Sequence, residues 1–274
     1  VFMKGCPLQC AWCCNPESQL ESPQLGYLKS KCSQCMECIN SCKQAALYES
    51  RSSLHVDFLR CTACGDCIEE CPDNALKIYG WETTTEEVMQ EVLKDKSFYE
   101  RSGGGMTLSG GEPMQQYKFS KELLIMAKKQ HIHTCIETSG YAPTKLFAEM
   151  KDYTDLFLYD YKIYHERYTG VDNNLIINNL RHLHDAGKDI VMRCILIPGM
   201  NDNEEHFRAI ADLEKELKNL KGIEIMPYHE YGKSKYATIG KTPFETGTST
   251  VEDEQVEIWL EKFKSLGCKK VKRG

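Results

Sequence analysis

Three cysteines near the start of the chain have a spacing that suits metal chemistry. Cys6, Cys10 and Cys13 follow a short apolar run in the stretch VFMKGCPLQCAWCCNPE and form a C-x3-C-x2-C pattern. Three thiolates on one loop can bind three irons of a [4Fe–4S] cluster and leave the fourth iron open to a small molecule. We therefore expect the catalytic chemistry at this motif.

Zinc and a disulfide are the alternatives for these cysteines. A structural zinc site would use Cys10 and Cys13 as half of a four-cysteine set, but it would need a matching second pair and would leave Cys6 without a role. A disulfide would require an oxidising compartment. Cys14 departs from the spacing because it is adjacent to Cys13, and we interpret it as a packed free thiol.

A second group of eight cysteines forms two copies of one pattern between residues 31 and 72. Each copy reads C-x2-C-x2-C-x3-C, the bacterial ferredoxin run, in which the fourth cysteine binds the cluster of the other copy. Eight cysteines at this spacing rarely arise for zinc or disulfides, and two clusters would cross-link a segment too small to bury a core alone. The pattern predicts one [4Fe–4S] cluster on Cys32, Cys35, Cys38 and Cys71, and another on Cys61, Cys64, Cys67 and Cys42.

Composition narrows the class of protein. The chain has 274 residues, of which 41% are hydrophobic, enough for one large domain or two smaller ones. We expect no membrane span and no signal peptide, and the net charge of −6 with interspersed charges speaks against nucleic acid as a partner. Most of the 15 cysteines fall in the motifs above, which favours metal-bound thiols in the cytoplasm; Cys135, Cys194 and Cys268 are expected to be ordinary thiols.

The first cysteine motif resembles a known family. Its spacing, followed by Asn15-Pro16-Glu17, resembles the radical S-adenosylmethionine (SAM) superfamily, and WCCNPES is similar to the cluster loop of glycyl-radical-enzyme activating enzymes. The resemblance implies that the three cysteines bind a [4Fe–4S] cluster whose open iron takes the amino and carboxylate groups of SAM, and that Trp12 and Asn15 belong to the cofactor site. The family usually carries another strand and loop before this point, whereas here the chain begins at Val1.

Strands and helices are predicted to alternate after residue 79, and they must position the first cysteine motif. Together with residues 1–4, apolar runs predict six strands, and amphipathic stretches between them predict six helices. The strands are expected at 1–4, 106–109, 132–137, 156–159, 190–197 and 223–226, and the helices at 84–96, 119–130, 143–150, 175–186, 204–219 and 251–266. This order predicts a parallel sheet with right-handed crossovers.

The fold class expected is therefore α/β. Six units are two short of a closed eight-unit barrel, and the resemblance implies the same partial (βα)6 radical SAM barrel, with an inserted ferredoxin-like α+β domain that binds two [4Fe–4S] clusters. The expected domains are 1–29 for the start of the barrel with the cluster loop, 30–78 for the insertion and 79–274 for the remainder of the barrel.

A glycine-rich turn follows the second predicted strand, at the end where such barrels carry their function. The paired glycines Gly110 and Gly111 let the backbone approach a ligand closely, although a plain turn is the alternative. With Glu112 and Pro113 they match the GGEP motif, whose strand edge holds the SAM amino group in the family.

Acidic, hydroxyl and basic side chains follow the third and fourth predicted strands. Glu137 and Thr138 end the third strand, and Asp160 and Lys162 follow the fourth. The residue types alone favour solvated loop charges and helix caps. The resemblance assigns Asp160 and Lys162 to SAM binding near the ribose and carboxylate, and it places Glu137 and Asp160 close enough to the SAM carboxylate to share a monovalent cation.

Two residues of later strands complete the predicted SAM site. Arg193 lies in the apolar segment MRCILIPG, where a buried guanidinium needs an anionic partner. A protein carboxylate would serve, and the resemblance favours the SAM carboxylate. His229, in MPYH, resembles the family histidine that contacts the ribose, although a lone histidine is more often structural.

The function implied by the resemblance is that of an activating enzyme. Such an enzyme reductively cleaves SAM to a 5′-deoxyadenosyl radical, which abstracts a hydrogen atom from a glycine of a larger partner, a glycyl radical enzyme. Flavodoxin or ferredoxin is the expected electron donor, in an anaerobic cytoplasm. The two-cluster insertion resembles the longer group of these enzymes, whose partners include choline lyase, glycerol dehydratase, arylacetate decarboxylases and hydroxyproline dehydratase.

Two other functions remain open at this point. Another radical SAM maturase or a small-molecule radical SAM enzyme would share the fold and SAM residues, but such maturases usually carry their extra clusters after the barrel. A plain electron-transfer protein would leave Cys6, Cys10, Cys13 and the GGEP segment unexplained.

Overall fold

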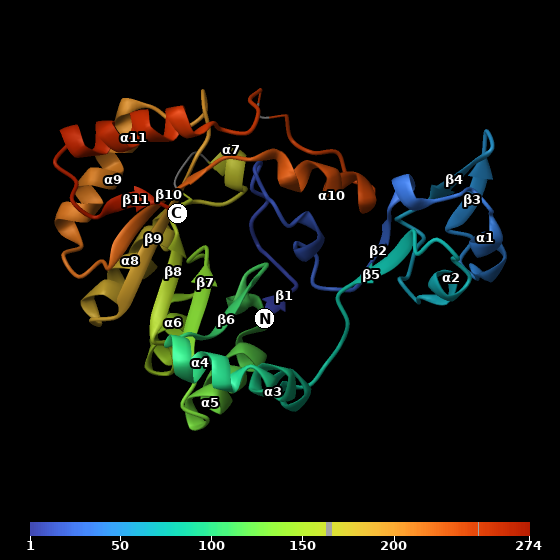
Figure 1. Cartoon of the computed structure of the whole chain (residues 1–274), viewed down its shortest axis with the longest axis horizontal. Helices are drawn as coiled ribbons and strands as arrows, with labels where there is room; N and C mark the ends of the chain where they lie inside the picture. The colour runs from blue at the N-terminus through green and yellow to red at the C-terminus, as the bar shows by residue number, and fades with distance from the viewer. Residues whose placement is uncertain (163–165, 246) are drawn as a thin grey trace.

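A parallel sheet of seven strands forms the centre of the molecule (Figure 1). The computed structural model describes residues 1–162, 166–245 and 247–274. The strands lie side by side in chain order, and each is parallel to its neighbours: β1 (Phe2–Met3), β6 (Gly105–Gly110), β7 (His133–Thr138), β8 (Leu156–Asp160), β9 (Asp189–Leu196), β10 (Gly222–Pro227) and β11 (Val271–Arg273). The α/β architecture with a parallel sheet is confirmed. The seventh strand was not predicted, because a charged three-residue segment carries no apolar pattern.

Helices connect the strands, and most of them cover one face of the sheet. They are α3 (Thr85–Lys94), α4 (Lys96–Ser102), α5 (Tyr117–Lys129), α6 (Thr144–Met150), α7 (Glu166–Thr169), α8 (Asn174–Asp185), α9 (Glu204–Glu216), α10 (Lys233–Thr238) and α11 (Asp253–Ser265). Thr84 and Glu87 form a capping box at the start of α3, which satisfies backbone N–H groups that have no partner within the helix. The six predicted helices are present with shifted ends. The short helices α4, α7 and α10 were not predicted, since four to seven residues show little periodicity.

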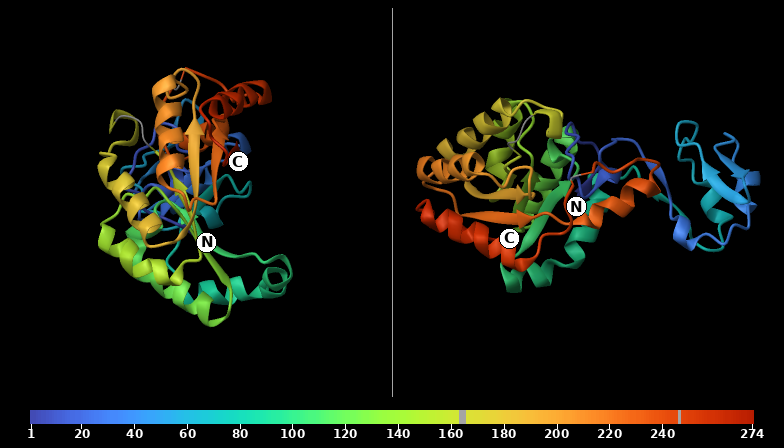
Figure 2. Two further views of the ribbon diagram at one scale, coloured as in Figure 1. Left: turned by 90° about the vertical axis from the view of Figure 1, so that its left-hand side faces the viewer. Right: turned by 90° about the horizontal axis from the view of Figure 1, so that it is seen from above.

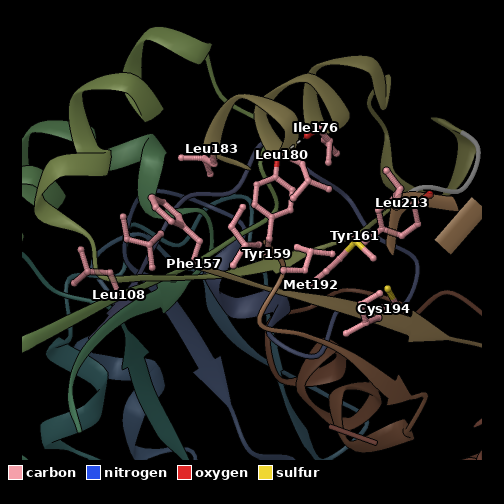
Figure 3. Close-up of a cluster of buried hydrophobic side chains, with 14 of the residues drawn as sticks. Leu108, Phe157, Tyr159, Tyr161, Ile176, Leu180, Leu183, Met192, Cys194 and Leu213 are labelled. Carbon is pink, nitrogen blue, oxygen red and sulfur yellow. Dashed lines mark hydrogen bonds between the residues drawn. The ribbon is translucent and has the colours of Figure 1, made fainter. Parts of the chain in front are cut away.

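The main core lies between the sheet and these helices. In Figure 3, Phe157, Tyr159 and Met192 of the sheet face Leu180 and Leu183 of α8. Alternate residues of a strand point to opposite faces, so the residues between them in sequence face away from the helices. No helix in the three described ranges has the length and hydropathy of a membrane span.

A smaller unit, here called the insertion (residues 24–79), stands apart from the sheet in Figure 1 and in the right-hand view of Figure 2. It contains the antiparallel pairs β2 (Gln24–Tyr27) with β5 (Leu76–Tyr79) and β3 (Leu47–Ser50) with β4 (Ser53–Val56), and the short helices α1 (Glu37–Ser41) and α2 (Asp66–Glu69). Leucines from all four strands and the cysteines form a core separate from that of the barrel. The pairing of β2 with β5 groups residues 24–27 with this unit, before the predicted boundary at residue 30.

Candidate functional site

An ion network lies at the carboxyl ends of three neighbouring strands, on the face opposite the helices. Because β7, β8 and β9 are parallel, Glu137, Asp160 and Arg193 meet at one edge, and Asp160 is in register with Arg193. Arg193 Nη1 lies 2.9 Å from Glu137 Oε1, and Arg193 Nε lies 3.6 Å from Asp160 Oδ1. Ser109 Oγ at the end of β6 donates to Glu137 Oε2 at 3.0 Å. The guanidinium thus has protein carboxylates as partners, one of the two alternatives left open by the sequence.

Arg193 retains a donor for a ligand. Its Nε is buried and forms no hydrogen bond with any described residue, since 3.6 Å from Asp160 is beyond hydrogen-bond distance. A buried donor without a partner is costly, and the carboxylate of a bound ligand would satisfy it. The space between Glu137 and Asp160 where a cation was expected holds this guanidinium, and the cation stays a prediction.

Lys162 connects the ion network to the first cysteine motif. Its Nζ lies 3.0 Å from Asp160 Oδ2. Burial alone would lower the pKa of Lys162, but Asp160 and the thiols of Cys10 and Cys6 outweigh burial and raise it. The ammonium of Lys162 therefore lies close to Asp160 and to two of the predicted cluster ligands, Cys10 and Cys6.

The first cysteine motif lies on the cysteine loop (residues 4–19), which follows β1. Burial, and then the neighbouring thiols of Cys13 and Cys6, raise the pKa of Cys10 to about 12. The loop is fixed by backbone bonds over long sequence distances: Gln9 N donates to Thr169 O at 2.8 Å and Ala11 N to Tyr168 O at 2.9 Å. The structure thus brings the three thiols together beside the ends of β7 to β9.

The GGEP segment packs against the start of the cysteine loop. A Cβ on Gly110, whose φ is +106°, would lie 2.3 Å from Met3 N, and one on Gly111 would lie 2.2 Å from Gly5 O. Glu112 N donates to Gly5 O at 2.7 Å. Gly110 is therefore required by the close approach of β6 to β1, and Gly111 by the close approach of the chain after β6 to the cysteine loop.

Glu112 is fully buried and its carboxylate is used within the protein. Oε1 accepts from Thr138 Oγ1 at 2.8 Å and Met114 N at 3.2 Å, and Oε2 accepts from Ser139 N at 2.8 Å and Ser139 Oγ at 2.6 Å. Burial raises the pKa of Glu112, and these hydrogen bonds oppose that shift. Glu112 and Thr138 hold the ends of β6 and β7 together, and a direct contact of either side chain with SAM stays a prediction.

The remaining predicted SAM residues, Trp12, Asn15 and His229, border the same region. Trp12 and His229 line a pocket open to solvent together with Cys13 and Tyr236. Trp12 Nε1 and His229 Nδ1 are buried and have no hydrogen-bond partner within the described ranges, so both can serve a ligand. Asn15 Oδ1 accepts from Lys235 Nζ at 2.7 Å.

Cys14 is half-buried, with Sγ 3.9 Å from His229 Nε2. The short distance between the two side chains had no signal in the sequence, because 215 positions separate them. Lys235 and Tyr236 were also missed by the sequence. Their only signal is their place in a glycine- and lysine-containing segment directly after His229.

Cysteines of the insertion lie close to one another, and their division into two cluster-binding sets stays a prediction. Burial, and then the thiols of Cys71, Cys32 and Cys35, raise the pKa of Cys38 to about 11. The four cysteines predicted for the other set, Cys42, Cys61, Cys64 and Cys67, all line one pocket.

Protein N–H groups are directed at the sulfurs of the insertion. Ala46 N donates to Cys42 Sγ at 3.2 Å and Ala75 N to Cys71 Sγ at 3.3 Å, which suits thiolates held by a metal group. Among the described residues, no three His, Cys, Asp or Glu side chains are arranged to hold a metal ion. That finding concerns single-ion sites, where ligands converge on one point, whereas the thiolates of a cluster bind different irons.

Comparison with known proteins adds independent findings. A family model described as the Radical SAM superfamily matches residues 1–213. The chain is 43% identical over 248 residues to the trans-4-hydroxy-L-proline dehydratase activating enzyme of Clostridioides difficile, covering 88% of this chain and 82% of that protein. It is 40% identical over 277 residues to the choline trimethylamine-lyase activating enzyme of Oleidesulfovibrio alaskensis, covering 96% and 89%. Its structure is similar to a domain of pyruvate-formate lyase-activating enzyme from Bacteroides vulgatus, with a TM-score of 0.52, 25% identity, and coverage of 62% and 99%.

Proposed function

Because the chain belongs to the radical SAM superfamily and is an activating enzyme of glycyl radical enzymes, we propose that its reaction takes place between the cysteine loop and the ion network at the ends of β7 to β9. The observation that carries this proposal is the position of Lys162, whose ammonium interacts with Asp160 and with the thiols of Cys10 and Cys6. The family's cofactors are a [4Fe–4S] cluster and SAM. When bound, they supply one-electron cleavage of SAM and hydrogen abstraction.

Cys6, Cys10 and Cys13 would hold that cluster. The donor set fits, because three thiols lie close together and the ammonium of Lys162 compensates part of their charge as thiolates. The same ammonium of Lys162 would also orient an anionic group of SAM.

The ion network would orient SAM. The free Nε of Arg193 would donate to the SAM carboxylate while Nη1 keeps its bond to Glu137. Because Glu137 holds the planar guanidinium in place, Arg193 would set both the position and the orientation of the SAM carboxylate. Gly110 and Gly111 would present backbone groups to the SAM amino group. Trp12 and His229, each with a buried ring nitrogen that has no partner among the described residues, would contact the nucleoside part and exclude water.

The insertion would bind two further [4Fe–4S] clusters, one on Cys32, Cys35, Cys38 and Cys71 and one on Cys42, Cys61, Cys64 and Cys67. The thiol groupings support these sets. We place the boundaries of the domain at residues 24 and 79, because β2 pairs with β5. These clusters, with all ligands from protein, would relay electrons from a flavodoxin or ferredoxin. Metal-bound thiols of this number suit a reducing cytoplasm.

The partner is a glycyl radical enzyme, and the relatives suggest which partners to test. Reduced, reconstituted protein and SAM would be mixed anaerobically with trans-4-hydroxy-L-proline dehydratase or choline trimethylamine-lyase. A glycyl radical in electron paramagnetic resonance (EPR), with one methionine formed per SAM cleaved, is expected with the cognate partner. SAM cleavage without any glycyl radical across a panel of such enzymes would instead favour a different substrate.

A further inference from the structure

The short helix α10 contacts both the cysteine loop and the insertion. It lies between the sheet and the insertion in Figure 1 and in the right-hand view of Figure 2. We propose that Lys235 of α10 is a positioning residue for the cysteine loop, and that α10 couples this loop to the insertion. The inference rests on the proposed function for the role of the loop, but the coupling itself is a property of the fold.

Lys235 holds the end of the cysteine loop. Its Nζ donates to Asn15 Oδ1 at 2.7 Å and to Glu17 Oε1 at 2.8 Å, two side chains that closely follow Cys13. Glu17 is only 17% exposed, and its Oε2 is buried without a hydrogen-bond partner in the part of the chain that the structure describes. Lys235 thus forms the ion pair with this carboxylate, and its removal would leave a largely buried charge with only the more distant ammonium of Lys4 to compensate it.

The N-terminal end of α10 packs against the backbone of Cys13, the last of the three predicted cluster ligands on the cysteine loop. A Cβ on Gly232, the residue before α10, would lie 2.8 Å from Cys13 O and 2.8 Å from Cys14 Cα. Its φ of −73° is ordinary, so glycine is required here by space and not by backbone conformation. Any shift of this end of α10 would displace Cys13 or Cys14.

The other end of α10 contacts the insertion at two points. Thr238 Oγ1 donates to Lys235 O at 2.6 Å and lies 3.3 Å from Tyr79 Oη, from which it can accept. Tyr79 ends β5. Gly240, with φ of +69°, follows α10, and a Cβ there would lie 2.1 Å from the Phe58 ring. Phe58 lies three positions before Cys61, so this contact reaches the second set of insertion cysteines.

These contacts make α10 a rigid link and not a passive surface helix. A six-residue helix is only about 9 Å long, and both of its ends are packed so closely that glycine is needed at each. Movement of the insertion against the barrel would therefore act on the cysteine loop through Gly232 and Lys235. The same link keeps the insertion at a fixed distance from the loop, as electron transfer between them would require.

Lys235→Met in the full-length, reconstituted protein tests the positioning role. We expect the iron content to stay unchanged, the affinity for SAM to fall about tenfold, and the EPR spectrum of the reduced, SAM-bound protein to change, because Asn15 and Glu17 lose the charge-assisted hydrogen bonds that hold the end of the cysteine loop. Lys235→Arg should restore most of both properties. The matched control is Lys233→Met on the same helix, whose ammonium pairs with Glu230 at 2.8 Å and Glu245 at 3.6 Å. Equal effects of the two methionine variants, or none from Lys235→Met, would overturn the proposal.

Phe58→Ala tests the coupling by a substitution within the insertion that changes no residue of the barrel. Amide hydrogen exchange of the reconstituted protein should become faster in residues 6–19 as well as within the insertion, and Lys235→Met should likewise speed exchange in both. A coupling through α10 would be refuted if Phe58→Ala sped exchange only within the insertion and Lys235→Met sped it only in α10 and the cysteine loop. This readout needs no SAM cleavage, so failure of the proposed function would appear separately, as wild-type protein that does not cleave SAM.

Discussion

The cysteine loop and the insertion hold their thiols by different means. The cysteine loop is positioned by groups far away in the sequence, such as Thr169, Lys162 and Lys235. The insertion positions its cysteines with its own short segments and its own core. In both of its copies the fourth cysteine accepts from the N–H four residues later, at 3.2 Å and 3.3 Å.

The internal repeat of the insertion extends to the backbone. Residues at equivalent positions in the two copies share a positive φ: 64° at Gln34 and 54° at Ala63, 65° at Met36 and 92° at Gly65, and 50° at both Ala45 and Asn74. The insertion is therefore an internal repeat in which one local pattern positions all eight cysteines. The cysteine loop leaves room for a ligand and depends on the barrel for its shape, which suits an open catalytic site.

Replacing Cys6, Cys10 and Cys13 together with alanine should have the largest effect. Three clusters correspond to about twelve irons per chain after anaerobic reconstitution. The triple variant should lose about a third of that iron and all SAM cleavage, while the insertion keeps its clusters because its core is separate. Iron analysis and product assays check this. Zinc in place of iron, or unchanged iron in the variant, would contradict our assignment.

Replacing Cys35 and Cys64 with serine is the converse experiment. Both thiols are exposed, so their loss disturbs packing little. Turnover with flavodoxin or ferredoxin should collapse if the insertion relays electrons, whereas a small chemical reductant that reaches the cysteine loop directly should still support SAM cleavage. Equal loss with both reductants, in protein that retains its first cluster, would exclude the relay.

Arg193→Ala should weaken SAM binding by about 2 to 5 kcal/mol if its free Nε pairs with the SAM carboxylate in a desolvated site. The variant also leaves Glu137 and Asp160 without their common cation, so a lower unfolding temperature is expected. Arg193→Lys keeps the charge but not the planar fork. Comparing the SAM affinity and the unfolding temperature of the two variants separates the effect on SAM binding from the effect on stability. Unchanged SAM affinity in the alanine variant would show that Arg193 serves only the protein carboxylates.

The smallest effect is expected from Gly65→Ala in the insertion. At φ of 92°, the added Cβ should cost about 1 to 2 kcal/mol through backbone conformation. Bleaching of the insertion clusters by an iron chelator should become faster, and Met36→Gly at the equivalent position should not accelerate it. Gly103→Ala, at φ of 70° and in open space, is the control in the barrel and should leave the insertion unaffected.

The sequence by itself determined those features that local spacing encodes. Apolar periodicity predicted six strands and six helices in the right order, and the cysteine spacing indicated a two-copy repeat whose backbone conformations match at equivalent positions. The cysteine motif and GGEP segment likewise indicated the family. Short or charged segments such as β11 and α10 were missed because they carry too little pattern to separate them from loops.

Tertiary structure decided which groups meet over long distances. Only the folding of β7 to β9 side by side gives Arg193 its partners Glu137 and Asp160, and only the burial of Glu112 beneath Ser139 turns a motif carboxylate into a support between two strands. The pairing of β2 with β5 brings residues 24–27 beside residues 76–79, and Lys235 reaches Glu17 across 218 positions. Such contacts depend on how separate elements pack, and no local pattern of residues encodes that.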